Sequence, residues 1–325
     1  MEGKQIGQPL DVASTVKRFA DRFGRMGIYG GIVVLLIIAA IAQPSLVGPA
    51  QLVTIAKLSA VLGIAALGQT FVTVSRGFDI SQGGVITLTV VLANTLMNGE
   101  AGNIFLGVTV CLLVSVIVGL INGLVVGFLK VPSIIASLGT FAVTTGGSVI
   151  YSGGVPTGSI PQAFLFLGRG YLGPMPVSVI VWLILTVVAG VILQRTVIGR
   201  SMFARGANET AAFQAGLNVL FYGALPYVLS SIAACIAGLV YASYIGLPVL
   251  SAGTQYSLST IAAAVVGGTS LAGGKGTMVG TSAGAFFLTM LSALIISFSL
   301  PEGVRMIVTG IIIIAAIYLS RRDEA

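Results

Sequence analysis

Few residues in this chain could carry acid–base or metal chemistry. The 325 residues include no histidine, and aspartate and glutamate together number nine. Cys111 and Cys235 each lie inside an apolar run, and their spacing suits neither a metal site nor a disulfide framework. Serine and threonine are frequent, but no general base accompanies them. The composition therefore predicts a protein that is not an enzyme and has no metal or cofactor of its own.

A glycine-rich segment, GGTSLAGGKGT (267–277), resembles a phosphate-binding loop at first sight. That loop requires serine or threonine directly after its lysine, and Gly276 follows Lys275. It also requires glycine where Thr269 stands, and no strand precedes the segment. We therefore interpret it as a glycine-rich break between two helices, and we expect no ATP hydrolysis by that route in this chain.

The segment SRGFDISQGG (75–84) places an acidic residue, Asp79, between two long apolar runs. Two roles stay open for it: a cap for the helix that follows, assisted by Ser81, or part of a gate or path for a polar solute. Further polar side chains within or beside the apolar runs suit either interhelical hydrogen bonds or contact with a solute. These are Gln69, Ser81, Asn94 and Asn122.

The elements that must position these residues are membrane helices. Hydrophobic residues make up 56% of the chain and charged residues 8%, and the mean hydropathy is +1.06. Apolar runs of helix length predict an all-α polytopic membrane protein with about ten spans. The expected spans are Phe23–Ala42, Leu52–Val74, Ile80–Met97, Ile104–Leu129, Pro132–Tyr151, Val177–Gln194, Leu220–Ile245, Ser257–Leu271, Gly276–Phe298 and Gly303–Ser320.

Basic residues indicate the orientation. With both termini in the cytoplasm, every lysine and arginine except Lys57, Arg169 and Arg305 falls on the inner side. This distribution accounts for the net charge of +7 through contact with the lipid bilayer, without a nucleic-acid partner. We expect a cytoplasmic tail (1–22), a single transmembrane domain (23–320) and a short cytoplasmic tail (321–325). The outer loop 152–176 is long enough for a short helix.

The long inner loop, 195–219, contains a predicted short helix. Asn208 can cap a helix that begins at Glu209, and Gly216 is a natural stop. This helix would then expose small and apolar side chains, those of Ala211, Ala212, Phe213 and Ala215. Two interpretations stay open: a docking element for a soluble partner, or a solvated connection with arginines on the inner side.

Four stretches together resemble the permease subunits of ribose-type bacterial ATP-binding-cassette sugar importers. In the inner loop, the matching residues are Gly199, Arg200, Gly206, Asn208, Ala211, Ala212 and Gly216. The other three stretches are GFDISQGG, NGLVVGFLKVPSIIASLGT (122–140) and STIAAAVVGGTSLAGGKGTMVGTSAGA. The resemblance runs from about residue 50 to 320. Phe78 and Gln82 depart from the family pattern beside Asp79, so they join the candidate path residues and leave the sugar open.

The resemblance implies a type II importer permease in the bacterial cytoplasmic membrane. It implies a permease homodimer, or a heterodimer with a paralogous permease, with a solute-binding protein outside. ATPase subunits holding ATP and magnesium would bind the inner loop, through the matching residues together with Arg205 and Glu209. The transported solute would be a monosaccharide or similar small polar molecule. A self-sufficient secondary transporter or channel is the alternative, and Asp79 would be its one candidate coupling acid.

Overall fold

The computed structural model describes residues 12–299, 303–304, 307–308 and 310–311. The first half of the fold contains the helices α1 (Val12–Ala42), η1 (Pro44–Val47), α2 (Pro49–Val74), α3 (Gln82–Met97), η2 (Ala101–Asn103), α4 (Ile104–Gly127) and α5 (Ser133–Ser152). The second half contains α6 (Gln162–Arg169), β1 (Tyr171–Leu172), β2 (Met175–Pro176), α7 (Val177–Arg195), α8 (Val197–Ala207), α9 (Glu209–Gln214), α10 (Val219–Ile245), α11 (Tyr256–Val266) and α12 (Met278–Ser297).

Within the described residues, six helices are long and apolar enough to cross a membrane: α2, α4 with η2, α5, α7, α10 and α12. Three shorter apolar helices, Gly27–Ala42, α3 and α11, correspond to other expected spans. The expected span Gly303–Ser320 lies mostly outside the described residues, as does the tail 321–325. The structure is therefore that of an all-α polytopic membrane protein.

Two expected spans differ from the helices found. The first was expected from Phe23, but α1 is kinked at Gly27, where φ of +58° favours glycine, and the apolar helix begins there. The eighth was expected over Ser257–Leu271, but α11 ends at Val266 because glycines follow it. Its 11 residues make a helix of about 16 Å, roughly half the apolar thickness of a bilayer.

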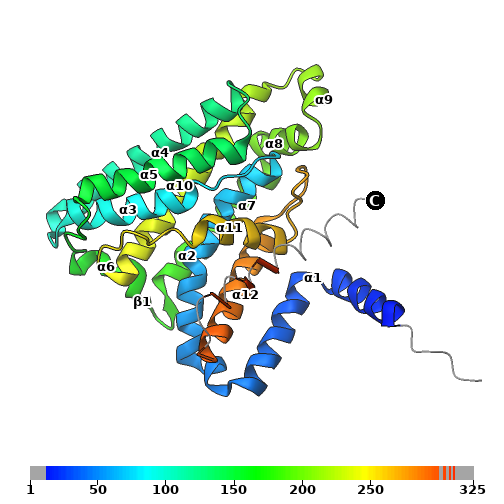
Figure 1. The fold of residues 1–325 in the computed structure, drawn as a ribbon, viewed down its shortest axis with the longest axis horizontal. Coiled ribbons are helices and arrows are strands. Elements are labelled where there is room, and N and C mark those ends of the chain that lie inside the picture. The colour runs from blue at the N-terminus through cyan, green and yellow to red at the C-terminus, as the bar shows by residue number, and fades with distance from the viewer. Residues whose placement is uncertain (1–11, 300–302, 305–306, 309, 312–325) are drawn as a thin grey trace, which may run out of the picture.

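Helices approach each other most closely where one of them presents a face of glycines. A methyl group added at Gly123 of α4 would lie 2.7 Å from the carbonyl oxygen of Ala224 in α10, and Gly119 is similarly close to Val228. In α12, Gly284 approaches the backbone of Ala263 in α11 in the same way. The four-residue glycine spacing thus produces tight packing within one chain. In the same part of the fold, α4 and α10 run side by side with α3 and α5 (Figure 1).

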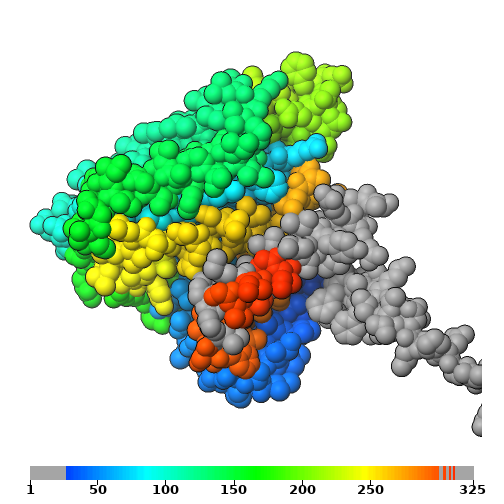
Figure 2. Space-filling model, viewed as in Figure 1, coloured from blue at the N-terminus to red at the C-terminus, as the bar shows by residue number. Residues whose placement is uncertain are grey.

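The two ends of the bundle differ. Helices α8 and α9 lie at one end, and α6 with the β1–β2 hairpin lies at the other (Figure 1). The loop 152–176 therefore does contain a short helix, α6, as expected. Between the ends, α4 and α5 lie on the surface (Figure 2). Large apolar residues of both helices are exposed there, including Ile150, which is 84% exposed. Lipid-facing helices have this character.

Candidate functional site: a coupling segment and a buried carboxylate

The candidate coupling segment, residues 195–219, folds as two helices. Asn208 caps α9 by accepting a hydrogen bond from the amide of Ala211 at 3.0 Å. Gly216 ends the turn with φ of +82°. The predicted cap and stop are thereby confirmed. Helix α8 was missed, because Gly199 and Gly206 weaken the helical pattern of the sequence.

Helix α9 presents one large apolar group to the surroundings. Phe213 is 67% exposed, and Glu209 and Ala211 are exposed beside it. Ala212 was expected on that surface, but it is buried. The exposed face of α9 is therefore narrower than the sequence indicated, and it is centred on Phe213.

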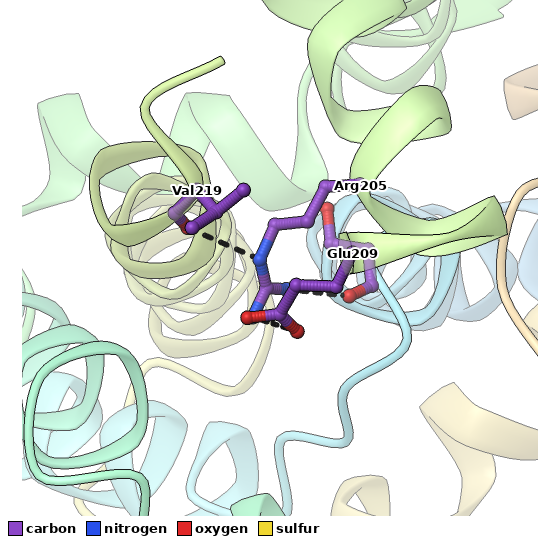
Figure 3. A network of polar contacts seen from close by, with 4 residues as sticks. Arg205, Glu209 and Val219 are labelled. Carbon is purple, nitrogen blue, oxygen red and sulfur yellow. Dashed lines mark hydrogen bonds and ion pairs between the residues drawn. The ribbon is translucent and has the colours of Figure 1, made fainter. Parts of the chain in front are cut away.

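Arg205, at the end of α8, ties this segment to the bundle (Figure 3). Its Nη1 donates to the carbonyl oxygen of Ser75 at 2.8 Å, and its Nε donates to that of Val219 at 3.1 Å. Its Nη2 lies 3.4 Å from a carboxylate oxygen of Glu209, the one ion pair within the described part of the chain. The guanidinium thus joins α8 and α9 to the end of α2 and the start of α10.

Two glycines of α8 allow it to pack closely against α2 and α7. A methyl group at Gly206 would lie 1.9 Å from the carbonyl oxygen of Val74, and one at Gly199 would lie 1.8 Å from that of Leu193. Gly274, from the glycine-rich loop 267–277, also donates its amide to the carbonyl oxygen of Val74 at 2.9 Å. Arg200, by contrast, is exposed, and within the described part of the chain its guanidinium donates one hydrogen bond, to the carbonyl oxygen of Arg195 at 3.3 Å. The joint accordingly depends on Arg205 and the glycines, not on Arg200.

Asp79 is fully buried in the connection between α2 and α3. One carboxylate oxygen accepts from the amide and the hydroxyl of Ser81, at 3.0 and 2.5 Å. The other accepts from the hydroxyl of Ser230 in α10 at 2.6 Å. Burying a carboxylate without a cation is costly, and these hydrogen bonds offset that cost. Arg76, a neighbouring cation, is exposed and forms no ion pair with Asp79.

The expected cap at Asp79 takes a different form. Helix α3 begins at Gln82, and no side chain caps its first turn. Asp79 instead closes the turn ahead of the helix through Ser81.

A wider network converges on this carboxylate. Asn122 of α4 donates to the Ser81 hydroxyl at 2.9 Å, and the Thr140 hydroxyl of α5 lies 2.5 Å from the Asn122 side-chain oxygen. On the other side, Gln82 donates to the Ser230 hydroxyl at 2.7 Å. We call Asp79, Ser81, Gln82, Asn122, Thr140 and Ser230 the Asp79 network. It joins α3, α4, α5 and α10 at one buried point, and Gln82 adds α2 through the carbonyl oxygen of Ala65 at 3.0 Å.

The remaining predicted path residues lie apart from this network. Gln69 and Asn94 are fully buried, each with its amide nitrogen bonded to its own helix and its side-chain oxygen unpaired. Phe78 is partly exposed and donates its backbone amide to the Ser133 hydroxyl at 3.1 Å. It lines a cavity of about 340 Å³ with Arg205 and Tyr227, so the coupling segment and the Asp79 connection meet there.

Sequence reasoning identified four members of the Asp79 network but missed Ser230 and Thr140. Both are hydroxyls within apolar helices, a residue type that is common in membrane helices for packing alone. Nothing in their local sequence separates them from the many other serines and threonines of the chain.

Comparison with known proteins gives consistent matches. The family model described as branched-chain amino acid transport system / permease component matches residues 51–317. The ribose import permease protein RbsC of Haemophilus influenzae is 34% identical over 290 residues, which cover 88% of this chain and 90% of that protein. The same permease of Bacillus subtilis is 32% identical, with 93% and 94% covered. The autoinducer 2 import system permease protein LsrC of Enterobacter sp. (strain 638) is 32% identical, with 81% and 77% covered. No solved structure matches the chain.

Proposed function

Because the chain belongs to the family of branched-chain amino acid transport system permease components and is the permease subunit of an ATP-binding-cassette importer, we propose that it carries a monosaccharide or a similar small polar solute. The similarity to ribose and autoinducer 2 import permeases along most of the chain carries this proposal. A self-sufficient secondary transporter is not favoured.

The partners follow from the importer class. An import permease of this class works with ATPase subunits and with a solute-binding protein that delivers the solute. We propose that two permease subunits form the membrane part, as a homodimer or with a paralogous permease. ATP and magnesium would be held by the ATPase subunits, since no phosphate loop occurs in this sequence.

The proposed topology has ten spans in the bacterial cytoplasmic membrane, with both tails, 1–22 and 321–325, on the inner side. The positions of the basic residues support it. Arg76, Arg205 and Gly274 meet at the end of the bundle where α8 and α9 lie. Lys57 and Arg169 meet elsewhere, where the Lys57 ammonium donates to the carbonyl oxygen of Arg169 at 3.2 Å.

We assign ATPase coupling to the 195–219 segment. An exposed Phe213 on a short capped helix suits insertion into a cleft of a soluble partner. Arg205 would carry the resulting movement to the carbonyl oxygen of Ser75, four residues before Asp79. The Asp79 network would then respond as part of the gate, along with Phe78 and Gln82, while Gln69 and Asn94 line the neighbouring interior.

The test of coupling uses two glycines with matched backbones. Gly216 and Gly173 both have positive φ, and an added side chain would meet no neighbour within 4 Å at either position. Each variant, Gly216→Leu and Gly173→Leu, is co-purified with the candidate ATPase and assayed for solute uptake with the binding protein. We expect Gly216→Leu alone to lose ATPase binding at least tenfold. Wild-type ATPase binding by Gly216→Leu would exclude the proposed role of α9.

The solute is identified with the complete importer. Membrane vesicles that contain permease, ATPase and binding protein are supplied with a panel of labelled solutes: pentoses, hexoses, a branched-chain amino acid and a nucleoside. We expect ATP-dependent uptake of a monosaccharide. Uptake of the amino acid alone would contradict the proposed solute class while leaving the importer class intact.

A further inference from the structure

The cavity of about 340 Å³ lies where the coupling segment meets the connection between α2 and α3. Its volume is near the lower end of the range of about 300–1,000 Å³ that is typical of small-molecule sites. Its lining combines apolar side chains with four polar ones. The apolar residues are Phe78, Val126, Pro132 and Ile134, the polar ones are Arg76, Ser133, Arg205 and Tyr227, and Gly77 completes the lining.

Two arginines bring positive charge to this cavity. Arg76 is exposed, and its guanidinium forms neither a hydrogen bond nor an ion pair within the described residues. Arg205 uses three of its five N–H groups, on the carbonyl oxygens of Ser75 and Val219 and on the carboxylate of Glu209. Its other two N–H groups therefore remain for a further acceptor.

The two neighbouring acids do not line the cavity. Glu209 is 55% exposed on α9, where it pairs with Arg205. Asp79 is buried, and its two carboxylate oxygens already accept hydrogen bonds, from Ser81 and Ser230. The lining thus includes two cationic groups and no anionic one, which favours a ligand of negative charge.

Tyr227 adds a buried hydroxyl at the cavity wall. Tyr227 is 2% exposed, and its hydroxyl has no hydrogen-bond partner of good geometry. A methyl group at Gly77, which also lines the cavity, would lie 2.5 Å from that hydroxyl oxygen. The polar neighbour of this hydroxyl is Ser133, whose own hydroxyl accepts from the amide of Phe78 at 3.1 Å. If one of the two hydroxyls donates to the other, the second still has a hydrogen for a ligand.

The start of α5 contributes further donors. Ser133 and Ile134 are its first two residues, and amides in the first turn of a helix have no acceptor within that helix. No side chain caps α5, and its first turn contains no acid. Amides in this position bind oxyanions, and the positive end of the helix dipole adds to the attraction. A phosphate group suits the combined donors, because its three oxygens accept several hydrogen bonds at once.

We propose that this cavity binds a phosphate group, which Arg76, Arg205, Tyr227 and the first amides of α5 hold. The phosphate belongs to a soluble phosphate compound or to the headgroup of an anionic lipid. A bound phosphate would tie the coupling segment to α5, in addition to the ends of α2 and α10 that Arg205 already joins (Figure 3). The effect on transport rests on the proposed role of the coupling segment, whereas binding itself does not.

The first arm of the test measures binding to the purified, full-length permease in phosphatidylcholine nanodiscs. Hydroxyphenylglyoxal modifies arginine side chains, and mass spectrometry compares Arg76 with Arg200, an exposed arginine outside the cavity. We expect inorganic phosphate to slow the modification of Arg76 at least fivefold relative to chloride at equal ionic strength, with Arg200 within twofold. Phosphatidylglycerol nanodiscs without added phosphate test the lipid source, and selective protection of Arg76 there would assign the site to a headgroup. Absence of selective protection under both conditions would overturn the proposal.

The second arm asks whether the phosphate enters the cavity. Tyr227→Phe removes the buried hydroxyl alone, and Tyr222→Phe removes a hydroxyl of the same helix outside the cavity. We expect Tyr227→Phe to raise at least threefold the amount of phosphate, or of phosphatidylglycerol, that half-protects Arg76. Tyr222→Phe should match the wild type. An unchanged half-protection in Tyr227→Phe would place the anion on the surface and overturn the cavity site.

The third arm measures the consequence in vesicles that contain the complete importer. Sugar uptake is compared with and without the phosphate source identified by labelling, for the wild type, Arg76→Gln and the control Arg200→Gln. We expect the source to slow uptake at least threefold in the wild type and in Arg200→Gln, but not in Arg76→Gln. The same slowing in Arg76→Gln would overturn the effect on transport. If the wild-type importer takes up no sugar, the proposed solute class fails, and the labelling arms still decide whether the phosphate site exists.

Discussion

Asp79 and Arg205 each connect several helices, but they differ in burial and in the charge of their partners. Asp79 is fully buried and is held by neutral donors, with no ion pair. Arg205, with 13% of its side chain exposed, binds two backbone carbonyls and one exposed carboxylate. A buried charge held by fixed neutral groups has few alternative arrangements. A partly exposed guanidinium can exchange partners with water, so the coupling segment can move with less cost than the Asp79 network.

Replacement of the buried charge gives the largest expected effect. In Asp79→Leu, the three donors from Ser81 and Ser230 lose their acceptor, at about 1–3 kcal/mol each, so about 3 kcal/mol or more of stability is lost. Asp79→Asn keeps an acceptor oxygen and should retain more folded protein and more transport. Thermal unfolding in detergent and uptake in vesicles measure the two variants. Equal loss of transport in both, with normal folding, would assign the role to the charge itself.

Removal of the Arg205 charge should lower stability less than Asp79→Leu does, and its effect should be confined to α8 and α9. Arg205→Gln loses the bonds to Ser75 and Val219, so we expect faster amide hydrogen exchange in α8 and α9 and little change in α4. Arg200→Gln is the matched control, because Arg200 binds a single carbonyl, that of Arg195. If Arg205→Gln lowers stability as much as Asp79→Leu, the contrast between the two regions is wrong.

Removal of a helix cap gives the smallest expected loss of stability, and it can be compared directly between α9 and α10. Asn208→Ala removes the cap of the short α9, and Asn218→Ala removes the cap of the long α10. Each change costs about 1 kcal/mol. That amount should unfold α9 locally while α10 stays protected, because tertiary packing dominates the stability of a long buried helix. Hydrogen exchange resolves the two helices, and equal deprotection of both would contradict a separately mobile α9.

How far the sequence could predict this structure depends on the range of each interaction. The cap at Asn208 and the stop at Gly216 depend on neighbours within a few residues, so they were predictable. The early end of α11 at Val266 was not, because it depends on the close approach of Gly267 to the backbone of Gly280 in α12. Ser230 and Thr140 were equally hidden as partners of the Asp79 network. Asp79 itself could be predicted as a site residue, since an acid between apolar runs is rare.

The hydrogen bond between Asp79 and Ser230 also fixes an order of events during biosynthesis. The two residues are 151 positions apart in the chain. At about 5–20 residues per second, the ribosome finishes Ser230 about 8–30 s after Asp79. Ser81, Asn122 and Thr140 are made within that interval, whereas the final donor arrives only with α10. A nascent chain that stops before α10 therefore carries a buried carboxylate that lacks one of its three donors.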